Sequence, residues 1–349
     1  MARKSISYQG KIVYVGIDVH KETYSLTCVC DGVVVKKATV KALPDDLANS
    51  LITWFAEATI KSAYEAGFSG YVLHRALCRQ RICSIVVNAA SIAVATNDRV
   101  KTDSRDSLKL ASQLAANQLV GIYVPTPQEE SRRTLTRTRQ QIVEKRSVAA
   151  RQIKSKLHYF GLMRLDDHRM ISNRYLKEIE TMKLPPEVKF SFCLLTDEWR
   201  YLTKKLFEIR QCLQAQALKD PHLEQVYRSV PGIGPISARV LANELGNLSR
   251  FQNEKSLSHY LGLTPSEHSS GDSIRRGHIS RQGSARLRGI LVEAAWRVIK
   301  KDPALNEVYE RIAKTRGGKR AIVAVARKLI GRIRACFRTG SLYAIDTYA

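Results

Sequence analysis

The sequence lacks the marks of a secreted, membrane-embedded or zinc-binding protein. Its seven cysteines are scattered, include no Cys-x-x-Cys pair or Cys/His cluster, and are odd in number, which argues against a zinc site and against a disulfide framework. No apolar signal segment opens the chain, and no apolar run approaches the length of a membrane span. We therefore expect a cytoplasmic protein with no membrane partner.

Acidic residues are scarce as well. The 349 residues include 57 Lys and Arg against 32 Asp and Glu, a net charge of +25. The excess is uneven, because residues 1–125 carry a net charge of +5 and residues 126–349 carry +20. This imbalance predicts a polyanionic partner such as nucleic acid. Apolar residues make up 44%, enough for a hydrophobic interior, and the length predicts two or three domains.

Residues 1–127 have the pattern of an α/β domain with a mixed sheet. Runs rich in β-branched residues between turn signals predict strands at 12–19, 24–30, 33–40, 60–65, 83–88 and 120–124. Helical patterns occupy residues 44–55, 71–81 and 104–118. Three consecutive strands followed by alternating helices and strands are typical of this fold class.

Four carboxylates of this domain form a candidate metal site: Asp18, Glu65, Asp103 and Asp106. Two of them end strands that can be neighbours in one sheet, and the other two share a face at the start of a helix. If the helix packs across the strand ends, the four converge, and they repel unless cations bind between them. Each acid alone could instead cap a helix. Together they indicate divalent-metal chemistry on a phosphate backbone, with Mg²⁺ or Mn²⁺ as the cofactor.

Residues 128–220 change in character and predict a helical arm. Long polar-rich helical patterns with sparse apolar seams cover residues 129–160 and 194–217. The two stretches suggest an antiparallel hairpin or coiled coil that serves self-association, although a solvated spacer has the same pattern.

The segment 221–349 begins with a candidate phosphate-binding turn. Pro231-Gly-Ile-Gly234 enters an apolar helix, as in a helix-hairpin-helix. Gly232 and Gly234 would let backbone N–H groups at the helix N-terminus approach a phosphate without reading sequence. An ordinary turn between two helices is the alternative.

A serine-rich loop follows, surrounded by arginines. A hydroxyl beside Gly271 could attack a phosphate whose charge the arginines hold. The candidate nucleic-acid-binding arginines are Arg275, Arg276, Arg281, Arg286 and Arg288, within a stretch, 271–339, that carries 18 basic and 5 acidic residues. No Ser/His/Asp triad is evident, and a serine-rich loop can also be only a loop.

The combination of motifs resembles a known family. These are the insertion-sequence transposases with an N-terminal RuvC-like DEDD domain and a C-terminal serine-bearing transposase domain, the bridge-RNA-guided recombinases. The resemblance covers nearly the whole chain, and its landmarks are specific as a set. They are Gly16–Lys21, Tyr64–Gly67, Asp98–Asp106, Pro231–Gly234, Gly262–Pro265 and Ser269–Gly271.

The resemblance implies a division into a RuvC-like, RNase H-like catalytic domain (1–127), a helical arm (128–220) and a mainly helical transposase domain (221–349). It implies that the four acids hold the metal and that Ser270 is the nucleophile that forms a phosphoserine bond with DNA. It also implies donor and target DNA, a non-coding bridge RNA, and a homodimer that forms a tetramer on DNA. The setting would be the nucleoid of a bacterial or archaeal cell.

Two other functions are compatible with the residues. One is a metal-dependent nuclease of the Holliday-junction resolvase type, in which water is the nucleophile and the serine loop only binds DNA. The other is a non-catalytic nucleic-acid-binding scaffold, which the intact set of four acids argues against.

Overall fold

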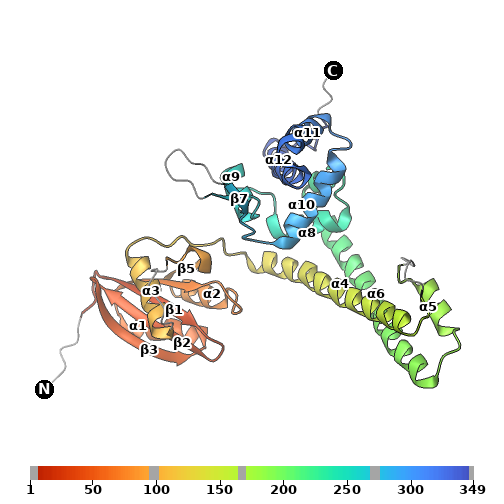
Figure 1. The fold of residues 1–349 in the computed structure, drawn as a ribbon. Helices are drawn as coiled ribbons and strands as arrows, with labels where there is room; N and C mark the ends of the chain where they lie inside the picture. Colours follow the sequence, from red (N-terminus) through yellow and green to blue (C-terminus); the bar gives the residue numbers. More distant parts are fainter. Residues whose placement is uncertain (1–6, 94–101, 164–169, 268–275, 346–349) are drawn as a thin grey trace. The chain divides into compact units, whose positions relative to one another are not determined.

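The computed structural model describes residues 7–93, 102–163, 170–267 and 276–345 (Figure 1). The chain separates into two compact units, Met1–Pro125 and Thr126–Ala349. No helix in these described ranges is both long and apolar enough to cross a membrane.

A five-stranded mixed sheet forms the centre of the first unit. Its strand order is β3-β2-β1-β4-β5, with antiparallel β1–β2 and β2–β3 pairs and parallel β1–β4 and β4–β5 pairs. The strands are β1 (Ile12–Val19), β2 (Thr23–Cys30), β3 (Val33–Lys41), β4 (Thr59–Glu65) and β5 (Cys83–Val87). The expected mixed sheet is therefore confirmed.

Helices cover both faces of this sheet. Alternate residues of β1, Val13, Val15 and Ile17, are fully buried in one core with the apolar faces of α1 (Pro44–Trp54) and α2 (Val72–Arg79). The opposite face receives α3 (Asp103–Ala115), which packs on β1, β2 and β4 (Figure 1). Because side chains alternate along a strand, Gly16 and Asp18 lie on the α3 face.

The contact between α3 and the sheet depends on small residues. A Cβ atom added at Gly16 would lie 1.9 Å from the backbone oxygen of Ser107 and 2.5 Å from the backbone nitrogen of Ala111. Beside it, the hydroxyls of Thr27 on β2 and Ser107 on α3 form a buried 2.8 Å hydrogen bond. The helix thus approaches β1 as closely as its own backbone allows.

Residues 120–124 differ from the expectation of a sixth strand. They form a single antiparallel bridge, between Gly121 and Val87, and the Ile122 N–H donates to the Val86 carbonyl. Glycine weakens a strand, and Pro125, which has no N–H, ends the run. A longer ladder does not form here.

The second unit is helical. The helices α4 (Pro127–Tyr159) and α6 (Pro186–Lys219) pack side by side, with α5 (Asn173–Glu180) between them in the chain. Ala149, Ile153 and Leu157 near the end of α4 share a core with Phe192 and Trp199 near the start of α6, so the two helices run antiparallel. The hairpin matches the expectation, except that α6 begins eight residues before the expected 194.

The remaining helices form the largest core of the chain, around α8 (Pro235–Leu245). They are α7 (Pro221–Arg228), α9 (Glu254–Tyr260), α10 (Ala285–Val298), α11 (Pro303–Arg316) and α12 (Gly318–Thr339). A small antiparallel pair, β6 (Pro265–Glu267) and β7 (Arg276–Ile279), accompanies them. The expectation of a mostly helical C-terminal region is confirmed.

Candidate active site

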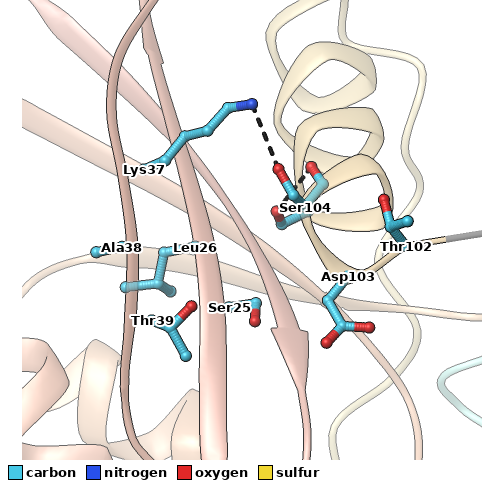
Figure 2. A pocket seen from close by; sticks show the side chains of 9 residues that line it. Ser25, Leu26, Lys37, Ala38, Thr39, Thr102, Asp103 and Ser104 are labelled. Atoms are coloured by element: carbon cyan, nitrogen blue, oxygen red, sulfur yellow. Dashed lines mark hydrogen bonds between the residues drawn. The ribbon is translucent and has the colours of Figure 1, made fainter.

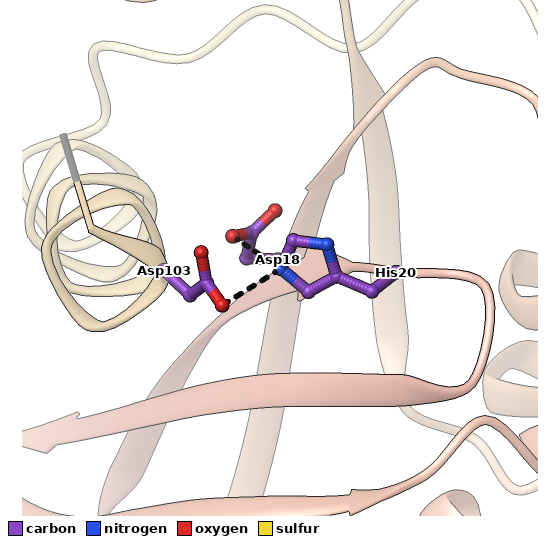
Figure 3. Close-up of side chains that lie close together, drawn as sticks. All are labelled: Asp18, His20 and Asp103. Atoms are coloured by element: carbon purple, nitrogen blue, oxygen red, sulfur yellow. Dashed lines mark ion pairs between the residues drawn. The ribbon is translucent and has the colours of Figure 1, made fainter.

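Two carboxylates and an imidazole meet at the end of β1. His20 Nε2 lies 3.1 Å from Asp18 Oδ2 and 3.1 Å from Asp103 Oδ2 (Figure 3). One donor atom from each residue lies within 4.8 Å of the other two. Among the described residues, no other three Asp, Glu, His or Cys side chains come this close together.

The local fold explains this meeting. Asp18 stands near the end of β1 on the face that α3 covers, and Asp103 is the first residue of α3. The close approach of α3 at Gly16 therefore carries Asp103 toward Asp18. His20 follows in the turn to β2, where its N–H donates to the Thr23 carbonyl.

The other two acids lie nearby without joining the cluster. Asp106 sits in the same first turn of α3 and is close enough for its charge to act on Asp18. Glu65 ends β4, the parallel neighbour of β1, where Ile17 pairs with Tyr64. Glu65 thus falls next to Asp18 in register, but its side chain is exposed. The structure places all four acids at one end of one sheet face and brings only Asp18 and Asp103 into mutual reach.

The Asp18 carboxyl is in an unfavourable place for a negative charge. Burial raises its pKa above the ordinary value, the neighbouring His20 lowers it, and the charges of Asp103 and Asp106 raise it. A bound cation would relieve this repulsion. The two carboxylate oxygens are donors that suit Mg²⁺ or Mn²⁺, and the imidazole nitrogen is a further donor for a transition-metal ion, so the residues fit a divalent ion.

His20 was missed as a site residue by the sequence analysis, although it lies within the Gly16–Lys21 motif. The available signal was its position two residues after Asp18, because residues two apart at the end of a strand point to the same side of the sheet.

The turn between α7 and α8 holds the two candidate glycines. Gly232 has a φ of +89° and packs against the Arg297 side chain, and Gly234 is the N-cap of α8, with Pro235 in its first turn. A Cβ atom added at Gly234 would meet nothing within 4 Å. The N-terminus of α8 is therefore open at this point.

The serine loop connects β6 to β7. Ser270 and Arg275 lie outside the described residues, and Arg276 begins β7. The base of the loop is tightly closed: Gly262 has a φ of +64°, and a Cβ there would lie 2.0 Å from the Gln282 carbonyl oxygen.

The other candidate arginines lie just after β7. Arg281 is exposed, with a φ of +55°. Arg286 donates to the Thr136 carbonyl on α4 at 2.6 Å, and Arg288 donates to the carbonyls of Leu261 and Gly283 at 3.1 Å. Arg288 thus ties the base of the loop to α10 (Ala285–Val298), and Arg286 ties α10 to α4.

Comparison with known proteins agrees with this arrangement. Residues 15–160 match the family model of the DEDD transposases of the IS110 type, and residues 224–310 match the model described as transposase IS116/IS110/IS902 family. The chain belongs to this family of transposases.

Relatives across bacteria support the assignment of this transposase. The putative transposase y4qE of Sinorhizobium fredii is 31% identical over 67% of this chain and 57% of its own length. The putative transposase y4rJ of the same organism is 28% identical over 91% of this chain and 90% of its own length. The transposase for insertion sequence element IS1111A of Coxiella burnetii is 25% identical over 65% of this chain and 64% of its own length.

The two family matches divide the site residues of the transposase between them. The first contains the Asp18–His20–Asp103 cluster with Glu65 and Asp106. The second contains the Gly232 turn, the Ser270 loop and the arginines that follow it. The family assigns the chain to enzymes that cleave and transfer DNA strands.

Proposed function

We propose that this transposase cuts and rejoins the DNA of an insertion sequence with two groups of residues, the acids around Asp18 and the hydroxyl of Ser270. The observation that carries the proposal is the convergence of Asp18, His20 and Asp103 at one end of the sheet. A half-buried carboxylate with two further acids near it is a ready site for a cation in an otherwise basic chain.

The acids are proposed to hold Mg²⁺ or Mn²⁺. Asp18 and Asp103 would be the inner ligands, and Asp106 and Glu65 are proposed to complete the site from the same end of the sheet face. Such an ion supplies stabilisation of the negative charge that develops on a phosphate during strand cleavage. The strand order and the placement of the acids support a RuvC-like, RNase H-like fold for residues 1–127.

Ser270 is proposed as the nucleophile. Its Oγ attacks the phosphorus of a DNA phosphodiester, a P–Oγ bond forms, and the P–O bond to the departing strand end breaks. The serine proton passes to the oxygen of that strand end. A hydroxyl of a second strand then attacks the phosphoserine and restores the serine, so the bond energy is retained. The close contact of Gly262 with Gln282 and the pairing of β6 with β7 hold together the described residues on either side of this segment.

The second unit is proposed to supply binding and assembly. The turn at Gly232 and Gly234 would act as a helix-hairpin-helix on the DNA backbone, because the start of α8 is open. The net charge of +20 after residue 125 supports binding of donor DNA, target DNA and a bridge RNA. Exposed apolar residues on α6, Phe190, Leu194 and Tyr201, support the arm (128–220) as the contact of a homodimer that forms a tetramer on DNA.

A covalent-adduct assay tests the proposal. The full chain is incubated with Mg²⁺, DNA carrying the ends of its element, and RNA transcribed from the flanking non-coding DNA. A labelled DNA end should become attached to the protein, Ser270→Ala should abolish the adduct and strand joining, and Asp18→Asn should abolish cleavage. The adjacent Ser269→Ala is the matched control and should retain both activities. Joining by Ser270→Ala would refute the serine assignment.

The metal cluster by itself also favours a second candidate, a resolvase-like nuclease in which water is the nucleophile. That enzyme cuts with Mg²⁺ and leaves no protein on the DNA, and Ser270→Ala does not change its rate. Binding without cleavage under every metal condition would instead identify a scaffold.

A further inference from the structure

An open hollow adjoins the Asp18–His20–Asp103 cluster. It has a volume of about 710 Å³ and lies between β2, β3 and the first turn of α3 (Figure 2). Most of its polar lining consists of hydroxyls, from Ser25, Thr39, Thr102 and Ser104, together with the Lys37 ammonium and the Asp103 carboxylate. We call this hollow the hydroxyl groove.

The strand register places residues of this groove in the same row of the sheet as Asp18. Thr39 on β3 pairs with Ser25 on β2, and Ser25 pairs with Asp18 on β1, so the three residues form one row across the sheet. Residues paired in this way have their side chains on the same face of a sheet. The row therefore runs from the edge of the sheet to the candidate metal site.

Lys37 lies in the next row and closes one side of the groove. It pairs with Thr27, and its Nζ lies 3.3 Å from Ser104 Oγ on α3 (Figure 2). Its neighbour Lys36 points to the opposite face, where its Nζ lies 4.3 Å from the centre of the Trp54 ring. Of the two adjacent lysines of this strand, Lys37 therefore lies on the same sheet face as the acids and Lys36 lies on the opposite face.

The chemistry of the groove suits a phosphodiester. Lysine and serine or threonine hydroxyls are the usual partners of backbone phosphates, and the groove lining contains no aromatic ring on which a base could stack. Asp103 at its end repels an anion, and a divalent ion held by Asp103 and Asp18 would remove that repulsion. Binding in the groove is therefore expected to depend on the metal.

We infer that the hydroxyl groove holds a phosphodiester of the DNA strand being cut, next to the scissile one, with Lys37 as a positioning residue. This inference rests on the proposed metal-dependent cleavage by the same face of the sheet. The contacts are to the backbone, so the groove orients any strand that reaches it and does not select sequence.

The test compares Lys37→Gln with Lys36→Gln in the full chain, with cleavage of element DNA as the readout. Lys37→Gln should lower kcat/KM about tenfold, Lys37→Arg should restore most of it, and Lys36→Gln should act as the unmodified chain. Mn²⁺ affinity should be unchanged in all three variants, because Lys37 is not a metal ligand.

DNA in which one phosphate has been replaced by an uncharged group identifies the phosphate that Lys37 contacts. Strands with a single methylphosphonate at successive positions beside the cut are cleaved by the unmodified chain and by Lys37→Gln. At the phosphate that Lys37 contacts, the loss of cleavage activity caused by Lys37→Gln and the loss caused by the methylphosphonate should not add, since each change removes the same interaction. Full additivity at every position, or equal activity of the Lys37→Gln and Lys36→Gln variants, would overturn the inference. So would a defect confined to RNA binding. If the unmodified chain does not cleave at all, the proposed function fails instead.

Discussion

Replacing Gly16 by alanine tests whether the approach of α3 to β1 assembles the candidate metal site. The added Cβ would lie 1.9 Å from the Ser107 backbone oxygen and 2.5 Å from the Ala111 backbone nitrogen. Neither atom belongs to a flexible side chain, so α3 must move by about 1.5 Å to restore ordinary van der Waals contact. That movement separates Asp103 from Asp18 and strains the buried hydrogen bond between Thr27 and Ser107.

The size of the effect follows from overpacking and from metal geometry. Insertion of a methyl group into a rigid contact costs up to about 3 kcal/mol, which corresponds to a fall in Tm of about 10 °C for a unit of this size. Ligand distances tolerate only about 0.2 Å, so Mn²⁺ affinity should fall by about 10–100-fold.

Calorimetry measures both quantities, by thermal unfolding and by Mn²⁺ titration, and hydrogen exchange of α3 reports the local loss. Gly67→Ala is the matched control, because a Cβ there would meet only the Glu65 carbonyl oxygen, at 4.0 Å. It should change the free energy of unfolding by less than about 0.5 kcal/mol. If Gly16→Ala binds Mn²⁺ normally and unfolds at the control's temperature, the proposed role of the close approach is wrong.

Two further substitutions each remove a carboxylate that is wholly or partly buried, and each should change the stability of the fold. The Asp18 pKa is raised in the folded state, so the folded chain binds more protons than the unfolded one above the ordinary carboxyl pKa, and stability falls as pH rises through the raised value. Asp18→Asn should therefore raise the Tm of the metal-free chain at neutral pH and flatten its pH dependence while Mn²⁺ binding is lost; a lower Tm would contradict this. Asp302 is fully buried, caps α11, and contacts Arg332 at 2.6 Å and the Tyr343 hydroxyl at 2.5 Å, so Asp302→Ala should cost about 3 kcal/mol in urea unfolding. Asp197 lies 3.8 Å from Arg200 at the surface, so Asp197→Ala should lower the free energy of unfolding by less than about 0.5 kcal/mol. Equal losses of stability in the Asp302→Ala and Asp197→Ala variants would refute the argument.

Local patterns were sufficient for the strands and helices of the first unit and for α4. The strands of the first unit follow their β-branched runs, and the helices α1 to α4 follow their apolar spacing, because both signals are written in a few neighbouring residues. The bridge at Gly121 and the early start of α6 were not foreseen. Pairing at 120–124 depends on a partner strand. The start of α6 coincides with Pro186 in the first turn of the helix, a local signal that was not used.

The sequence by itself determined that the chain is basic, that a mixed α/β unit precedes a helical one, and that its acids stand at strand ends and at a helix start. Those properties depend on composition and on spacing along the chain. Only the tertiary structure decided that Asp18 meets Asp103 through His20, that Glu65 stands aside, and that Lys37 and not Lys36 faces them. These outcomes depend on strand register and on how closely α3 can approach Gly16, which are contacts between residues far apart in sequence.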